Sequence, residues 1–270
     1  MKRRNALLLM TASLPAACTF LRSDNVPIHQ IFDTLPGNPE QRTLLIFLPG
    51  LLDYAEDFDR YGFNQTVRAA RLPIDMISVD ANLHYFQNGS IVERIVNDVI
   101  EPARQRGYRR IWLAGISLGG LGAMLVASSF AGLDGLISIA PFLGRESSLA
   151  EIKAAGGHAN WQPTPASKML QWERDLHLWL KMSLSGAADP SSADKTRIIL
   201  GYARQDRYAV EQRELAAKLP PNDVITVDGQ HDWPAWQHIW QQIINKHGMM
   251  IAGFSDRHPE PLSATRRSPS

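Results

Sequence analysis

Six short, continuous apolar runs constrain the fold of this chain more than any other feature of its sequence. None of them alternates with polar residues, so both faces of each run are expected to be buried. This pattern is typical of a mostly parallel sheet that is covered by helices on both faces. The runs are Thr43–Leu48, Ile74–Val79, Arg110–Ala114, Leu136–Ala140, Arg197–Leu200 and Val224–Val227.

Helical patterns separate these runs. In 91–100, apolar residues recur at spacings of three and four and charged residues fill the other face. The stretch 118–130 is rich in Gly, Ala and Leu, as expected of a helix packed closely on a sheet, and 236–243 indicates a last helix. From 145 to 195 the strand signals disappear, and Trp, Met and Leu follow mostly helical spacing. This stretch predicts a small helical cap inserted between two strands.

The sequence therefore predicts one α/β domain over 41–255, preceded by a linker at 18–40 and followed by a flexible tail at 256–270. Lys and Arg together number 28 and Asp and Glu 27. This balance gives no strong field for a polyanion and argues against a nucleic acid partner. The single cysteine, Cys18, excludes an intramolecular disulfide and any metal site built from several cysteines.

Cys18 ends a segment that reads as an export signal at 1–17. Basic residues at 2–4 precede the apolar run Ala6–Met10, and small residues lead to the cysteine. The run is too short to span a bilayer, which needs about 20 residues. The segment resembles a bacterial lipoprotein signal, although Pro15 stands where that family usually has Leu. The resemblance implies acylation of Cys18 and anchoring on the periplasmic or outer-membrane side. The alternatives are a soluble periplasmic protein and a cytosolic one.

The motif Gly115-Ile116-Ser117-Leu118-Gly119 lies between a strand signal and a helix signal. This G-x-S-x-G order indicates a nucleophile elbow, a tight turn that exposes the serine hydroxyl near the N-terminus of the following helix. Ser117 is therefore the candidate nucleophile.

A serine needs a base and an orienting acid to attack at neutral pH. His231 follows the last strand signal and is the candidate base, and Asp206 follows the strand before it and is the candidate acid. Glu146 is the alternative acid, and Asp232 is interpreted as a residue that shapes the histidine loop.

Backbone N–H groups are needed to stabilise the negative charge that develops on a substrate oxygen. The candidates are Leu118, directly after the nucleophile, and Leu51, in the loop after Thr43–Leu48. Asp53 and Tyr54 shape that loop or are simple turn residues.

With these motifs in place, the chain resembles the α/β-hydrolase superfamily over about residues 41–246. The resemblance implies hydrolysis of an ester-like bond in a small molecule through an acyl-enzyme, without metal or organic cofactor. A carboxylesterase or lipase-like enzyme fits it best. Thioesterase, amidase and acyltransferase activities use the same triad and stay open, as does a non-catalytic binding lipoprotein of this fold. The apolar residues of the cap either form a substrate pocket or only pack the cap onto the sheet.

Overall fold

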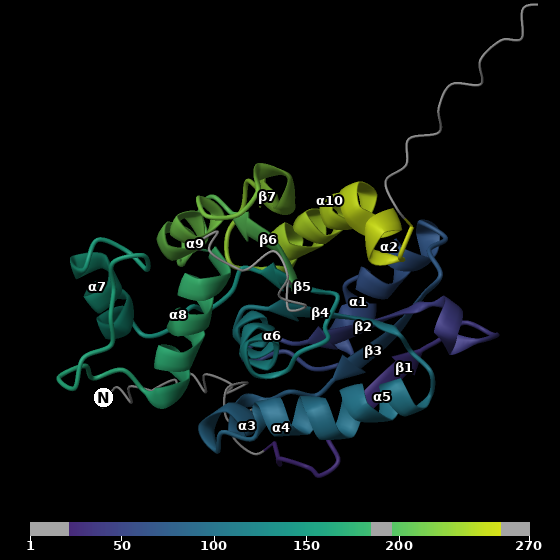
Figure 1. Ribbon diagram of the computed structural model, residues 1–270. Helices are drawn as coiled ribbons and strands as arrows, with labels where there is room; N and C mark the ends of the chain where they lie inside the picture. Colours follow the sequence, from purple (N-terminus) through teal and green to yellow (C-terminus); the bar gives the residue numbers. More distant parts are fainter. Residues whose placement is uncertain (1–21, 185–195, 255–270) are drawn as a thin grey trace, which may run out of the picture.

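The centre of the protein is a sheet of seven strands in the order β1-β3-β2-β4-β5-β6-β7 (Figure 1). The computed structural model describes residues 22–184 and 196–254. All neighbouring strands are parallel except β1, which pairs antiparallel with β3 at one edge. The strands are β1 (Gln30–Asp33), β2 (Thr43–Leu48), β3 (Ile74–Val79), β4 (Arg110–Ile116), β5 (Gly135–Ile139), β6 (Arg197–Ala203) and β7 (Val224–Val227). Each of the six predicted apolar runs is a strand, and the predicted α/β class is confirmed.

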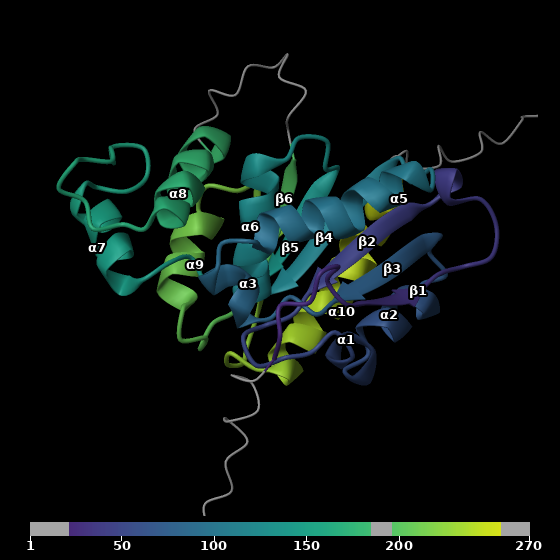
Figure 2. The ribbon, with the colours of Figure 1, turned by 90° about the horizontal axis from the view of Figure 1, so that it is seen from below.

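Helices cover both faces of the sheet (Figures 1 and 2). Helices α1, α2 and α10 lie on one face, and α4, α5, α6 and α8 lie on the other. The α-helices are α1 (Asp57–Arg60), α2 (Phe63–Ala69), α3 (Leu83–Gln87), α4 (Ile91–Ile95), α5 (Glu101–Gln105), α6 (Leu118–Ser129), α7 (Glu146–Ala154), α8 (Gln171–Leu184), α9 (Ala209–Ala216) and α10 (Trp233–Ile251). A π-helical turn at Val96–Ile100 joins α4 to α5, and short 3-10 turns lie at Pro39–Gln41 and Pro221–Asp223.

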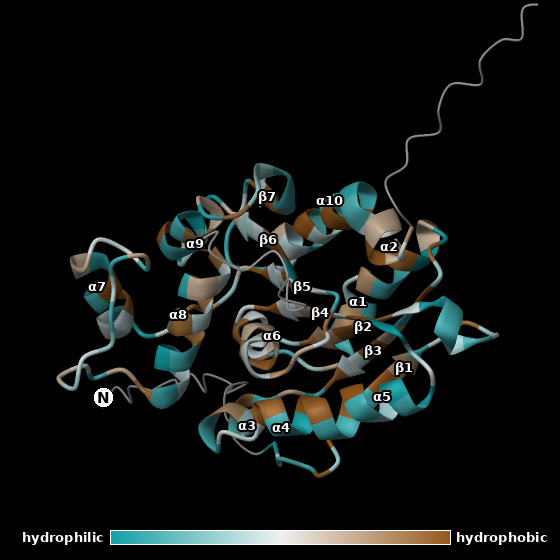
Figure 3. Cartoon of the chain, in the orientation of Figure 1, coloured by the Kyte–Doolittle hydropathy of each residue, from teal (hydrophilic) through white to brown (hydrophobic). Residues whose placement is uncertain are grey.

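Successive residues of the strands feed two separate apolar layers. Leu44, Ile46 and Leu48 of β2 contribute to the layer beneath α6, whereas Leu45 and Phe47 contribute to the layer beneath α10. All five are fully buried. Hydrophobic residues accordingly concentrate on the strands and on the inner sides of the helices (Figure 3). Burial on both faces is the reason that the strands read as continuous apolar runs.

The sheet begins earlier in the chain than predicted, because β1 lies within 18–40, which the sequence assigns to a linker. This strand has only four residues and stays partly exposed at the sheet edge, so it lacks a continuous apolar run. The predicted signal at 1–17, Cys18 and the tail at 256–270 lie outside the described residues. Within the described part of the chain, no helix is long and apolar enough to cross a membrane.

The predicted cap is helical where it is described, and its two helices differ in their packing. In α8, Leu176 and Leu180 are fully buried in the same apolar layer as α6. Near α7, a separate small cluster forms from Ile152, Trp161 and Met169. Helix α8 therefore belongs to the body of the domain, and only the α7 region has a core of its own. Residues 185–195 of the predicted cap lie outside the described residues.

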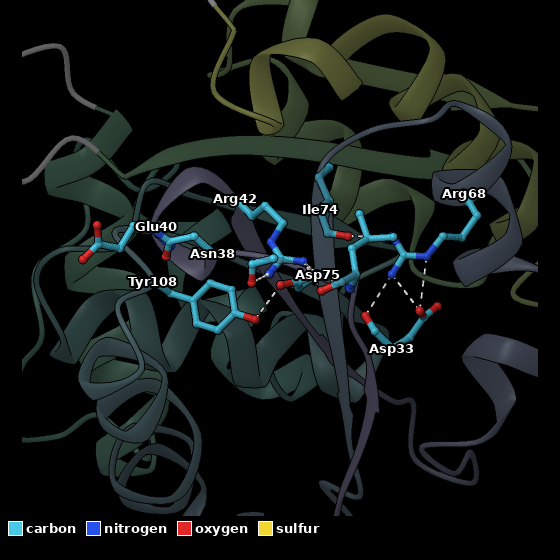
Figure 4. Close-up of polar contacts among 10 residues, drawn as sticks. Asp33, Asn38, Glu40, Arg42, Arg68, Ile74, Asp75 and Tyr108 are labelled. Carbon is cyan, nitrogen blue, oxygen red and sulfur yellow. Dashed lines mark hydrogen bonds and ion pairs between the residues drawn. The ribbon is translucent and has the colours of Figure 1, made fainter.

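A buried polar network lies near the N-terminal ends of the parallel strands (Figure 4). Asp75 of β3 is fully buried and accepts hydrogen bonds from Tyr108 Oη at 2.6 Å and from Arg42 Nη1 at 3.1 Å. Burial, together with the hydrogen bond to Asp75, raises the pKa of Tyr108 to about 12. Arg68 of α2 donates a hydrogen bond to Asp33 at 2.6 Å and so links α2 to the end of β1.

Candidate active site

Ser117 lies at the junction of β4 and α6, at the C-terminal edge of the sheet. Its backbone has φ 53° and ψ −112°, a conformation that L-residues rarely adopt. The backbone around it fixes this turn, since Ser117 N donates to Ile139 O at 2.9 Å and Phe142 N donates to Ser117 O at 3.1 Å. The predicted strand-to-helix turn is present.

Two glycines of the motif are required by close backbone contacts. A Cβ on Gly115 would lie 2.1 Å from the carbonyl oxygen of Gly119. A Cβ on Gly119 would lie 2.1 Å from the carbonyl oxygen of Leu48 and 2.6 Å from that of Pro49. Glycine at 119 thus lets the start of α6 approach the end of β2, and it brings the nucleophile turn against the loop that contains Leu51.

The structure brings Ser117, His231 and Asp206 into one hydrogen-bonded chain. His231 Nε2 lies 2.9 Å from Ser117 Oγ, and His231 Nδ1 lies 2.7 Å from Asp206 Oδ2. Asp206 Oδ1 also accepts a hydrogen bond from Tyr208 N at 2.8 Å. The side chain of Asp206 is fully buried and that of His231 is 8% exposed. Because the buried carboxylate of Asp206 accepts a hydrogen bond from Nδ1–H, the proton of the neutral imidazole stays on Nδ1. Nε2 is then free to accept the serine proton.

The acid Asp206 and the base His231 lie close together because they follow neighbouring strands. Strands β6 and β7 are adjacent and parallel, so the loops after them leave the sheet side by side. Arg204 N donates to Val227 O, and Gln205 N donates to Gly229 O. In return, Gly229 N donates to Gln205 Oε1 at 2.7 Å. These bonds join the two loops into one unit that positions both side chains.

Aromatic side chains enclose the imidazole of His231. The rings of Tyr208 and Trp236 lie 5.2 Å and 5.1 Å away and are nearly perpendicular to it. Edge-to-face contacts of this kind favour one ring orientation. The imidazole is therefore held on two sides by rings and at Nδ1 by the acid.

Asp53 lies at the site. From the sequence alone, it either shapes the loop after β2 or is a simple turn residue. Its carboxylate accepts a hydrogen bond from Trp233 Nε1 at 3.0 Å, and its N–H donates to Gly50 O. Burial raises the pKa of the Asp53 carboxyl, and the hydrogen bond from Trp233 opposes this change. Asp53 thus connects the Leu51 loop to the first residue of α10, two positions after His231. A separation of 180 residues gives no local signal for such a contact.

Arg22 ties the start of the described chain to the same loop. Its Nη1 donates to Asp53 O at 2.8 Å, and its guanidinium lies over the Tyr54 ring at 4.1 Å from the centroid. It also forms an ion pair with Asp80. Charge and stacking together hold the chain at Arg22 against the edge of the site, and nothing in the sequence pattern indicates this.

The remaining sequence candidates take different positions. Glu146, the alternative acid, is exposed at the start of α7, and the acid that contacts His231 is Asp206. Asp232 caps α10 by accepting a hydrogen bond from Ala235 N, which fits the predicted loop-shaping role. Leu118 is the first residue of α6, so its N–H has no acceptor within the helix. Leu51 lies in the adjacent turn, and its role as oxyanion donor stays a prediction, as does that of Leu118.

The histidines of the cap form a pair away from the triad. His158 Nε2 lies 3.0 Å from His177 Nδ1, and burial together with the neighbouring His158 lowers the pKa of His177 to about 4. Across the described ranges, no three His, Cys, Asp or Glu side chains are grouped so as to hold a metal ion.

No protein-family model matches the sequence, and no curated protein matches it. Solved structures do match the fold. Est1E from Butyrivibrio proteoclasticus is 15% identical, with a TM-score of 0.57 over 83% of this chain and 94% of that one. A monoacylglycerol lipase from Paleococcus ferrophilus is 15% identical, with a TM-score of 0.52 over 83% and 99% of the two chains. The S-formylglutathione hydrolase FrmB from Staphylococcus aureus is also 15% identical, with a TM-score of 0.50 over 81% and 96%.

At this level of identity the likeness concerns the fold. The mostly parallel sheet, the helices on both faces and these structural neighbours show that the chain has the α/β-hydrolase fold. The chemistry of the site is a separate question, because one fold supports many activities.

Proposed function

We propose that this protein is a serine hydrolase that cleaves an ester bond in a small molecule through an acyl-enzyme intermediate. The observation that carries the proposal is the hydrogen-bonded chain from Asp206 through His231 to Ser117. Each member stands in the orientation that its role needs, and the serine sits on a strained turn that presents its hydroxyl.

The geometry supports the following sequence of steps. Ser117 Oγ attacks the acyl carbon while His231 Nε2 takes its proton, and the negative charge on the substrate oxygen is stabilised by the N–H groups of Leu51 and Leu118. His231 then gives the proton to the leaving oxygen, whose bond to the acyl carbon breaks. His231 then deprotonates a water molecule, which attacks the acyl carbon of the acyl-enzyme. The bond between the acyl carbon and Ser117 Oγ breaks, His231 returns the proton to Oγ, and the acid is released. Asp206 keeps Nδ1 protonated and stabilises the imidazolium throughout.

A carboxylesterase or lipase-like activity is the form we favour. The structural neighbours include a monoacylglycerol lipase and an S-formylglutathione hydrolase, so they support hydrolysis of an acyl group without identifying the leaving atom. Thioester or amide hydrolysis and acyl transfer use the same residues. A non-catalytic binding protein is less well supported, because such proteins commonly lack a triad member and this chain has all three.

The test is labelling with a fluorophosphonate probe, which reacts with activated serines. We expect the wild-type protein and Ser147→Ala, a variant of an exposed serine in α7, to be labelled equally. Ser117→Ala should show no label. A wild-type protein that stays unlabelled, or a Ser117→Ala protein that labels normally, would contradict the proposal. Rates on an ester, a thioester and an amide with the same acyl group then identify the preferred bond.

We further propose that the protein is exported and anchored through an acylated Cys18. Arg22 lies four residues after this cysteine, and four residues of extended chain span at most about 14 Å. An anchor there would therefore hold the Leu51 loop close to the membrane surface. Mass spectrometry of the mature N-terminus is the test: an acylated Cys18 is expected, and an unmodified N-terminus at any other residue rules the anchor out.

A further inference from the structure

An elongated apolar groove begins beside the nucleophile and runs along α6. Its volume is about 670 Å³, and it is partly open to solvent. Its walls come from α3 and α4 on one side and from the start of α8 on the other. It will be called the α6 groove. Phe142, whose N–H donates to Ser117 O, lines the end nearest the site.

The floor of the α6 groove is a single stripe of one helix. Leu118, Leu121, Leu125 and Ser128 all line it, at the spacing that places residues on one helical face. From Leu118, adjacent to the nucleophile, to Ser128 the helix rises about 15 Å at 1.5 Å per residue. The groove therefore extends along α6 from the residue that follows the nucleophile.

The walls are suited to an uncharged chain. Phe86 packs over Gly122, where a Cβ would lie 3.1 Å from its ring, and Leu170 and Trp172 form the opposite wall. Asp175 is the single charged side chain in the lining, and its carboxylate already accepts a hydrogen bond from Gln171 at 2.8 Å. The residues that line the groove include no Lys, Arg or His, so the lining offers no positive charge to an anionic ligand.

The position of the groove relative to His231 distinguishes the two halves of an ester. The leaving oxygen must take its proton from His231 Nε2, so the alcohol half lies toward the histidine. Helix α10, which follows His231, packs in the apolar layer on the opposite face of the sheet from Leu121 and Leu125. The groove on the α6 face is therefore placed to receive the acyl half.

We propose that the α6 groove binds the linear acyl chain of the substrate and accommodates about 12 carbons. A methylene adds about 1.25 Å to an extended chain, from a C–C bond of about 1.5 Å at a near-tetrahedral angle. Fifteen ångströms thus correspond to about 12 carbons. The inference rests on the proposed function, because it assigns the acyl part of that substrate. It makes the enzyme selective for medium-length and long-chain acyl esters.

The expected signature is a rise of kcat/KM with chain length. Full burial of a methylene gives about fourfold, and half-burial in an open groove gives about twofold. For 4-nitrophenyl esters from acetate to palmitate, kcat/KM of the wild-type enzyme should rise about twofold per carbon and level off near laurate. Equal rates for all chain lengths would overturn the proposal while leaving the serine hydrolase assignment intact.

Leu125→Trp tests whether the acyl chain of the substrate lies in the α6 groove. Leu125 lies seven residues, about 10 Å, beyond Leu118, so a bulkier side chain there blocks the groove after about eight carbons. We expect the laurate ester to lose about 16-fold, four carbons at twofold each, while acetate and butyrate esters stay within twofold of wild type. Met249→Trp, a change at an exposed position on α10, is the matched control and should leave the profile unchanged. Normal rates on acetate also report that the variant is folded.

A binding measurement separates this proposal from the catalytic one. The Ser117→Ala protein is titrated with a fluorescent fatty acid of 12 carbons, and binding is followed by emission. Binding that Leu125→Trp weakens about 16-fold in the same background supports the groove even if no ester is hydrolysed. Binding that is unaffected by Leu125→Trp, or no binding at all, contradicts it.

Discussion

Replacement of Asp206 by Asn gives the sharpest test of the triad, because the structure fixes how the new amide must point. Tyr208 N donates to Oδ1 at 2.8 Å, and an N–H needs an acceptor there, so the amide oxygen of Asn takes that position. The amide NH₂ then occupies the Oδ2 position, 2.7 Å from His231 Nδ1. Since NH₂ only donates, Nδ1 must lose its proton and Nε2 must carry it. The base can no longer accept the serine proton.

We expect kcat to fall about 10³- to 10⁴-fold, the loss known for a triad histidine held in the wrong tautomer, with KM changed by less than about threefold. The substitution is close in shape, so Tm should stay within a few degrees. Steady-state hydrolysis of a short ester and the rate of fluorophosphonate labelling measure the effect.

Two variants control this experiment. Asp232→Asn makes the same change one residue from His231, at the N-cap of α10, where Asn serves as well as Asp. Its kcat should equal that of wild type. Glu146→Gln should also have no effect, because Glu146 is exposed at the start of α7. The reasoning fails if Asp206→Asn loses less than tenfold, or if Glu146→Gln shows the large loss instead.

Three further predictions concern the stability and alignment of the site. Tyr108→Phe should make the free energy of unfolding less dependent on pH at high pH. The pKa of Tyr108 is about 12 in the folded protein against 10.0 unfolded, so the wild type loses about 2 kcal/mol between pH 10 and 12, which urea unfolding measures. Gly119→Ala should abolish labelling and lower Tm, because its Cβ meets the carbonyl oxygen of Leu48; normal labelling would refute this contact. Trp233→Phe removes the hydrogen bond to Asp53, of about 1 kcal/mol, and should lower kcat about fivefold at pH 7 with Tm nearly unchanged; an unchanged kcat would refute a role in alignment.

The sequence predicts the parallel part of the sheet well because those strands are buried on both faces. It does not predict β1, whose partly exposed residues Gln30–Asp33 carry too little apolar signal. The role of α8 is also hidden, because its helical spacing is the same whether Leu176 and Leu180 pack within a separate cap or against α6.

The triad is predictable for a different reason. Ser117 is recognised from the glycines on both sides of it. Asp206 and His231 are predicted because each lies shortly after the end of a strand signal. The contacts that align them are not predictable, since Trp233 with Asp53 and Arg22 with Tyr54 join segments that share no sequence pattern. The sequence does not predict the α6 groove either, because its two walls come from distant parts of the chain.

The aromatic enclosure of His231 has an optical consequence. Trp236 lies edge-to-face against the imidazole at 5.1 Å, and Trp233 lies 5.3 Å from Trp236. A neighbouring imidazolium quenches indole emission, and in the proposed mechanism His231 becomes an imidazolium when it takes the serine proton. The protein thus carries two neighbouring indoles beside its proposed general base, and their emission can respond to a charge on that imidazole without any added label.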